Sequence, residues 1–209
     1  VMDTIKDFIR QLIADGFAYK TEDGSTYFSI QKYQEKFGDY GALMGEKFMD
    51  GKKINARIAN DEYHKDDLSD FALWKAHTPE DAQIFWDDPL LGRGRPGWHI
   101  ECSAANWEKF EGATTTIHTG GVDLRFPHHT NEIAQSAPRY SPQPFTKHWF
   151  HSEHLLVDGK KMSKSLGNFY TLRDVEEKGF SGLDFRYLVL DNHYQKQQNF
   201  NFQILEQAR

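Results

Sequence analysis

The sequence is poor in cysteine and has no long apolar run. Cys102 is the single cysteine among 209 residues, so no disulfide can form within the chain. No apolar stretch approaches the roughly 18 residues of a membrane-spanning helix, which predicts a protein that does not enter the membrane. Together these absences exclude a disulfide scaffold and predict a cytoplasmic location.

The sequence also lacks an excess of positive charge. Its net charge of -6 and pI near 5.9 argue against a general nucleic-acid coat, although a local basic strip can still bind RNA on an acidic protein. Hydrophobic residues make up 38% and aromatic residues 14% of the chain, enough to build one core with a smaller appendage. The chain begins Val1-Met2-Asp3 without a signal segment and enters a helical pattern directly, so we expect a section of a longer protein.

The first 90 residues read as a mixed region of helix, hairpin and polar chain. Apolar residues recur with helical spacing from Ile5 to Ile13, with Asp3 or Thr4 as the expected cap and Gly16 as the end. A β-hairpin is predicted across residues 17–30. Residues 31–70 are polar and charge-rich and are interpreted as a surface excursion.

Strands and helices alternate in the rest of the chain. Helices are expected at residues 97–110 and 127–137, and strands at 114–118 and 149–157, which predicts an α/β sheet. Further on, Thr171 with Asp174 three residues later predicts a capped helix start, and residues 183–190 continue as helix. The predicted division has three parts, at residues 1–90, 91–152 and 153–209.

A lysine-rich turn stands out near the C-terminal third. We call residues 158–168 the lysine loop; it contains Lys161, Met162, Ser163, Lys164 and Ser165, flanked by glycines. Two flexible ammonium groups on a mobile loop suit the binding of nucleotide phosphates. The alternative is a solvated basic turn.

Three side chains could hold a metal ion. His128 and Glu132 are four residues apart on a predicted helix and project from one side of it, and Cys102 could supply a thiolate. Sulfur, imidazole and carboxylate together suit zinc, whereas calcium or magnesium would need more oxygen. The alternative is a buried cysteine and a helix-surface hydrogen bond, because periodicity does not place Cys102 beside His128.

Other polar residues lie close to these in the sequence. His99, His118 and His129 are expected to surround a metal site or to lie in the core rather than to act as ligands. Trp98 is either a core aromatic or the wall of a small pocket. Asp123 either binds an ammonium group at the end of a strand or caps a turn.

Several segments together resemble cysteinyl-tRNA synthetases, a class I synthetase family. The match is carried, in order and spacing, by four segments: Gly94 to Ala104, His118 to His129, Asn131 to Ser136 and Lys161 to Asn168. The resemblance implies the second half of a class I Rossmann-type catalytic domain, preceded by an α+β insertion and followed by a helical stem region. It also implies ATP-dependent activation of cysteine and its transfer to tRNA(Cys), by a protein that is expected to be a monomer.

The resemblance assigns roles to individual residues. Cys102, His128 and Glu132 correspond to zinc ligands, with His128 also facing the substrate. Trp98 and Asp123 correspond to the amino-acid pocket. Lys161 to Ser165 correspond to the ATP-binding KMSKS signature, in which both lysines stabilise the departing pyrophosphate and Mg²⁺ accompanies ATP.

The sequence departs from the family in several places. The family's HIGH signature and a further cysteine ligand do not occur here, so we expect the fourth zinc ligand to lie outside this chain and the chain alone to be inactive. Thr119, Thr130 and Glu153 also replace residues that are usual in the family. Two alternatives stay open: a related ligase that joins cysteine to an amino sugar, and a non-catalytic zinc or RNA-binding module.

Overall fold

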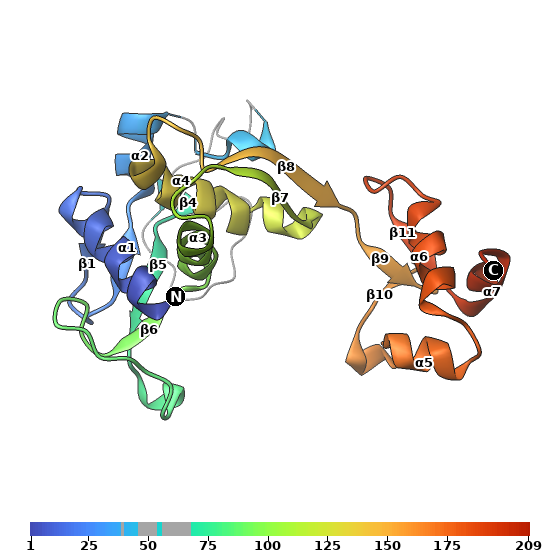
Figure 1. Ribbon diagram of the computed structural model, residues 1–209. Coiled ribbons are helices and arrows are strands. Elements are labelled where there is room, and N and C mark those ends of the chain that lie inside the picture. Colours follow the sequence, from blue (N-terminus) through green and yellow to red (C-terminus); the bar gives the residue numbers. More distant parts are fainter. Residues whose placement is uncertain (39, 46–53, 56–67) are drawn as a thin grey trace. The chain divides into compact units, whose positions relative to one another are not determined.

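The computed structural model describes residues 1–38, 40–45, 54–55 and 68–209 (Figure 1). The chain forms two compact units: the first comprises residues 1–118 and 124–149, and the second comprises residues 119–123 and 150–209. The three-part division expected from the sequence stays a prediction. Much of the expected excursion at 31–70, including Lys52-Lys53 and Asp66-Asp67, lies outside the described residues.

The first unit contains most of the helices and strands. In chain order they are α1 (Met2–Ala14), β1 (Ala18–Lys20), β2 (Thr26–Phe28), α2 (Ile30–Phe37), η1 (Ala42–Met44), β3 (Ile54–Asn55), β4 (Leu68–Ser69), β5 (Phe71–Ala76), η2 (Pro79–Asp81), β6 (Gly94–Pro96), α3 (Trp98–Lys109) and α4 (His128–Tyr140). The paired strands β7 (Thr115–Gly121) and β8 (Thr146–Ser152) begin in this unit and end in the second. The short helix η3 (Val122–Arg125) begins in the second unit and ends in the first.

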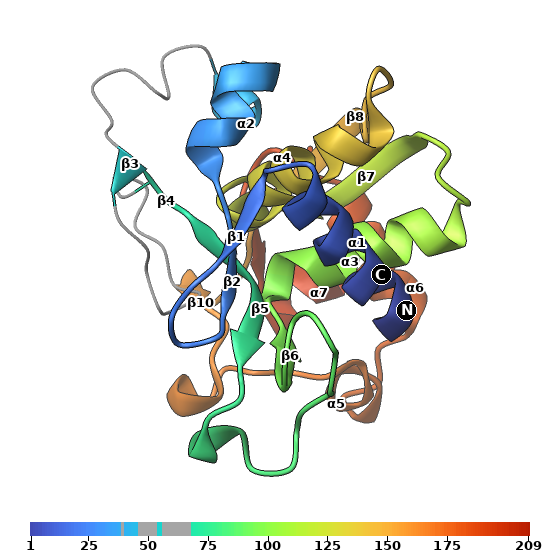
Figure 2. The same cartoon turned by 90° about the vertical axis from the view of Figure 1, so that its left-hand side faces the viewer.

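An antiparallel sheet with the order β1-β2-β5-β6 forms one layer of the first unit. Helices α1 and α3 pack against each other, and α3 packs against β5 on one side and α4 on the other (Figure 2). The core between these elements is aromatic and aliphatic; Phe8, Phe28, Trp74 and Ile100 are fully buried. Because α3 lies between the sheet and α4, its position is fixed from two sides.

Two glycines allow α3 to start close to the sheet. A Cβ atom on Gly94 would lie against the backbone carbonyl oxygen of Lys75, and one on Gly97 would lie against that of Ala72. Gly97 also donates its N–H to the carbonyl oxygen of Leu73 at 2.9 Å. The turn into α3 therefore requires residues without a side chain at Gly94 and Gly97, in addition to the pairing of the strands.

The second unit has a smaller core around a three-stranded sheet. Its elements are β9 (Leu155–Val157), β10 (Lys160–Lys161), η4 (Lys164–Leu166), α5 (Leu172–Glu177), α6 (Gly182–Leu190), β11 (Gln198–Phe200) and α7 (Phe202–Gln207). Strand β9 pairs antiparallel with β10 and parallel with β11. Val157, Phe200 and Leu205 are buried between the sheet and the helices.

Most of the expected local elements are confirmed. The first helix, the hairpin and the helices at 97–110, 127–137 and 183–190 are present, and Thr171 caps α5 in a capping box with Asp174. The cap expected at Asp3 or Thr4 was wrong, because α1 already begins at Met2. No helix in the described part of the chain is both long and apolar enough to cross a membrane.

Two other expectations are corrected by the structure. The single strand expected at 149–157 is interrupted: β8 ends at Ser152 and β9 begins at Leu155. The start of the expected surface excursion is a helix, α2, which begins after the N-cap Ser29 and buries Tyr33. The apolar residues of α2 are separated by polar and charged residues, so the segment was interpreted as polar chain and its helical spacing was overlooked.

Candidate metal centre and lysine loop

The three predicted metal ligands come together in the first unit. Cys102 lies in α3, and His128 and Glu132 lie in the first two turns of α4. One ligand atom from each lies within 4.8 Å of the other two, and the sulfur side is accessible to solvent. Ligands of one zinc ion lie roughly 3 to 4 Å from one another, so small side-chain adjustments would let these three share an ion.

Glu132 is the residue that most requires a positive partner. Its carboxylate is fully buried, and neither oxygen has a hydrogen-bond partner among the described residues. The nearest cationic group is Nε2 of His128, 3.0 Å from Oε1 of Glu132. Because a buried carboxylate is costly unless it is paired or coordinates a metal, this site fits a bound cation.

The electrostatics of the site favour a charged His128 when no metal is bound. Burial lowers the pKa of His128, but the thiol of Cys102 and the nearby carboxylate of Glu132 outweigh this effect and raise the pKa to about 9. The neighbouring His99 is the reverse case, because burial and the charge of His128 lower its pKa to about 3. The two Nδ1 atoms are 3.0 Å apart, within hydrogen-bond distance of each other.

A second group of side chains shares the same carboxylate. Ligand atoms of His118, His129 and Glu132 also lie within 4.8 Å of one another, with the two Nε2 atoms 3.6 and 3.9 Å from Oε1 of Glu132. Both imidazole rings contact Trp149, at centroid distances of 4.7 and 4.9 Å. Glu132 is thus surrounded by imidazoles, and it is the acidic centre of the site.

Trp98 lies on the accessible side of the metal centre. Its side chain is 42% exposed, which rules out the core-aromatic alternative. The indole stacks on the imidazole of His128, with ring centroids 4.5 Å apart and an interplanar angle of 24°. The role of Trp98 as a pocket wall stays a prediction.

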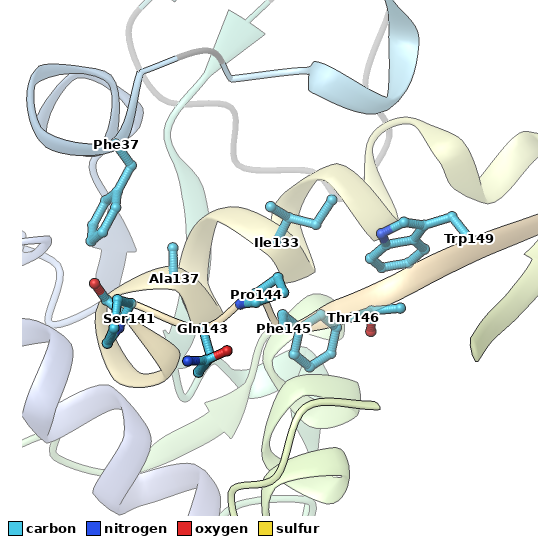
Figure 3. A pocket seen from close by; sticks show the side chains of 10 residues that line it. Phe37, Ile133, Ala137, Ser141, Gln143, Pro144, Phe145, Thr146 and Trp149 are labelled. Carbon is cyan, nitrogen blue, oxygen red and sulfur yellow. The ribbon is translucent and has the colours of Figure 1, made fainter. Parts of the chain in front are cut away.

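An apolar cavity of about 290 Å³ lies on another side of α4 (Figure 3). Phe37, Ile133, Phe145 and Trp149 line it, and none of its lining residues is ionisable. Trp149 also contacts His118 and His129, so it separates this cavity from the imidazole cluster. Acid–base or metal chemistry has no suitable group in this cavity.

The predicted phosphate-binding residues form an ordered loop in the second unit. The side chain of Asn168 accepts a hydrogen bond from the backbone N–H of Ser163 at 2.9 Å and donates one to the carbonyl oxygen of Lys161 at 3.1 Å. The hydroxyl groups of Ser163 and Ser165 lie 2.7 Å apart. Asn168 thus joins the two ends of the segment that carries the lysines.

The side chains of this loop divide between solvent and core. Lys161 and Lys164 are exposed, and the ammonium of Lys164 lies 5.6 Å from the ring centroid of Phe169. Met162 instead packs against the buried cluster of the second unit and lines a small cavity there together with Tyr170. Both ammonium groups are consequently available for an anionic ligand.

Asp123, Thr130 and Glu153 lie in three different parts of the structure. Asp123 lies in η3 in the second unit, close to Gly121, and it belongs to neither metal group. Thr130 is buried and donates to the carbonyl oxygen of Arg125 at 2.7 Å, so its hydroxyl is satisfied. Glu153 is half-buried beside a cavity of the second unit.

A polar cluster that was not expected from the sequence lies behind the metal centre. Gln135, Ser136 and Ser103 are fully buried between α3 and α4, and Gln135 and Ser136 both hydrogen-bond to the hydroxyl of Ser103. Gln135 and Ser136 follow Glu132 by three and four residues, so helical spacing could have placed them on its side of α4.

Comparison with known proteins identifies the family. Residues 1–209 match the family described as "tRNA synthetases class I (C) catalytic domain". The chain belongs to this family. The match confirms the resemblance and the mixed α/β class of the fold at the level of a class I catalytic domain.

Relatives of this class I family include proteins named cysteine–tRNA ligase. The relative from Chlamydia caviae is 54% identical over 92% of this chain, that from Opitutus terrae 53% over 97%, and that from Brachyspira hyodysenteriae 47% over 99%. The chain spans only 39%, 44% and 43% of their respective lengths. A solved structure, the putative arginyl tRNA synthetase from Campylobacter jejuni, matches 98% of this chain and 34% of its own, with 15% identity and a TM-score of 0.53, which shows the fold.

Proposed function

We propose that this chain is the part of a cysteine–tRNA ligase that selects cysteine and binds the phosphates of ATP. The whole enzyme would activate cysteine with ATP and transfer it to tRNA(Cys). Within that enzyme the chain would supply the second half of a Rossmann-type catalytic domain, with an insertion before it and a stem region after it. We expect the enzyme to be a cytoplasmic monomer.

The observation that carries this proposal is the convergence of Cys102, His128 and Glu132 around a buried carboxylate without hydrogen-bond partners. Their donor set, one sulfur, one nitrogen and one oxygen, suits zinc. We propose that a residue outside this chain supplies the fourth protein ligand. When bound, zinc offers a position to a soft sulfur ligand and so favours a cysteine thiolate over the hydroxyl of serine.

The other residues of the chain would orient the substrate. The exposed face of Trp98 would cover the side chain of cysteine next to His128, and Asp123 would bind its ammonium group. The raised pKa of His128 favours its protonated form, in which neither ring nitrogen has a free lone pair. His128 would therefore lose a proton when it ligates the metal. This makes metal uptake dependent on pH.

The lysine loop would act on ATP. When the carboxylate of cysteine attacks the α-phosphate, negative charge builds up on the departing pyrophosphate. Lys161 and Lys164 would stabilise this charge, and Met162, Ser163 and Ser165 would form the rest of the loop around the phosphates. Mg²⁺ accompanying ATP would share the charge.

Metal content tests the ligand assignment. In the intact protein we expect Cys102→Ala to lose stoichiometric zinc on elemental analysis, because it removes the single thiolate that this chain supplies. His148→Ala is the matched control, since His148 is exposed and belongs to neither metal group. Equal zinc in the two variants would contradict the assignment.

Activity of the intact protein tests the wider proposal. Cysteine-dependent ATP–pyrophosphate exchange followed by charging of tRNA(Cys) is the expected result. Ligation of cysteine to an amino sugar would instead identify the related ligase. The absence of any exchange would indicate a binding module.

A further inference from the structure

A dry polar cluster joins the two helices that carry the metal ligands. Nε2 of Gln135 donates to the backbone carbonyl oxygen of His99 at 2.7 Å and to Oγ of Ser103 at 2.6 Å. The hydroxyl of Ser136 is 3.0 Å from the same Ser103 oxygen. Gln135, Ser103 and Ser136 are each 0% exposed, so water does not compete for these bonds.

We propose that Gln135 is a positioning residue that sets the register of α4 against α3 and thereby the separation of Cys102 from His128 and Glu132. Ser103 directly follows Cys102, and Gln135 lies three residues after Glu132. Each bond of Gln135 therefore fixes a point on α3 close to a ligand. The inference rests on the proposed function only in taking Cys102, His128 and Glu132 as zinc ligands; the register of the two helices does not depend on it.

Close to Cys102 and Glu132, apolar packing offers little to hold this register. Small residues occupy the interface at this level, including Ala104, Ala134 and Ser103, and they offer little to interdigitate. A slide of one residue along a helix moves a side chain by about 1.5 Å. Metal–ligand distances tolerate only about 0.2 Å, so directional bonds are needed to hold the helices in place.

The same glutamine also affects the imidazole of the site indirectly. It holds the backbone of His99, whose Nδ1 lies 3.0 Å from Nδ1 of His128. Partners behind metal ligands commonly change metal affinity roughly 10- to 100-fold when they are removed. We expect Gln135 to act with a strength in this range.

The test compares two variants that both remove hydrogen bonding between α3 and α4. Gln135→Met keeps the length of the side chain and removes both donated bonds. Tyr140→Phe is the control: the Tyr140 hydroxyl donates from α4 to Asn106 in α3 at 3.1 Å, further along the helix pair from the ligands. Zinc affinity is measured by competition with a chelator, and Co²⁺ reports thiolate coordination through its absorption spectrum.

A measurement on the metal-free protein tests the register of α4 against α3 directly. Trp98 in α3 stacks on His128 in α4, so nuclear Overhauser effects between the two rings report their distance in the metal-free protein. Gln135→Met should weaken these signals and lower zinc affinity at least about 10-fold, with a weaker thiolate–Co²⁺ band. Tyr140→Phe should change none of the three, although both variants lower the melting temperature.

The outcomes separate the inference from the proposed function. If Gln135→Met lowers only the melting temperature and otherwise matches Tyr140→Phe, its role is structural and the inference fails. If the intact protein without substitutions binds no zinc, the proposed metal site fails, but the Trp98–His128 signals still decide the register. Should Gln135→Met not fold, Ser103→Ala removes one of the two acceptors; unchanged ring signals and zinc affinity in that variant would overturn the inference.

Discussion

Replacement of Gly97 with alanine tests how closely α3 approaches the sheet. Gly97 directly precedes α3, and an added Cβ would lie against the carbonyl oxygen of Ala72 and 2.8 Å from its carbonyl carbon. The φ angle of Gly97 is -69°, a value that alanine adopts readily, so any effect comes from the contact and not from backbone strain. Since the clashing atoms are backbone, rotation of a side chain cannot relieve it.

The expected loss of stability follows from two contributions. Forcing a methyl group into packed backbone costs about 1 to 3 kcal/mol. Alanine is also worse than glycine at an N-cap, by about 1 kcal/mol. Together the free energy of unfolding of the first unit should fall by about 2 to 4 kcal/mol, which corresponds to a decrease in melting temperature of roughly 4 to 16 °C.

Tryptophan fluorescence during urea unfolding measures this loss, because all five tryptophans lie in the first unit. Gly182→Ala is the control: the nearest atoms to its added Cβ are methyl groups of Leu172 at 3.9 Å, and it lies in the second unit. It should leave the fluorescence transition unchanged. A loss below about 0.5 kcal/mol for Gly97→Ala would refute the close approach, because that is the size of an ordinary surface effect.

Two further predictions concern the lysine loop and the acid stability of the first unit. Asn168→Ala removes the bonds to Lys161 and Ser163, so amide hydrogen exchange across residues 161–168 should accelerate and the KM for ATP in pyrophosphate exchange by the intact protein should rise; unchanged exchange and KM would contradict the role of Asn168. Asp81 has a pKa lowered from 3.8 to about 2, mainly by its hydrogen bond from Arg95, so its stabilisation is complete above pH 3.8 and is lost as the pH falls towards 2. The melting temperature of Asp81→Asn should therefore depend less on pH across this window, and identical curves for the two proteins would show that the ion pair contributes nothing.

Secondary structure could be predicted from the sequence where the residues of a single segment determine it. The apolar spacing from Ile5 to Leu12 predicts α1, and Thr171 with Asp174 predicts the start of α5. The same kind of signal was present but overlooked in α2, where Ile30, Tyr33 and Phe37 are spaced as on a helix. Local propensity could have found that helix.

Contacts between segments could not be read in this way. Spacing alone puts His128 and Glu132 on one side of α4, but it says nothing about Cys102, which is 26 residues earlier in the chain. Its thiolate chemistry made Cys102 a candidate ligand, the family resemblance assigned it to the same site, and the packing of α3 on α4 brings it close. The cluster around Gln135 depends on the same packing, which explains why the sequence alone did not indicate that its polar residues meet.

The stacking of Trp98 on His128 has a consequence for how the imidazole can move. Nε2 of this ring faces Glu132 and Nδ1 faces His99, so the two nitrogens are not equivalent. Exchanging them would require a half-turn of the ring, and the edge of the ring would then sweep through the space that the indole occupies. The indole thus restricts rotation of the imidazole and keeps the same nitrogen directed at the carboxylate.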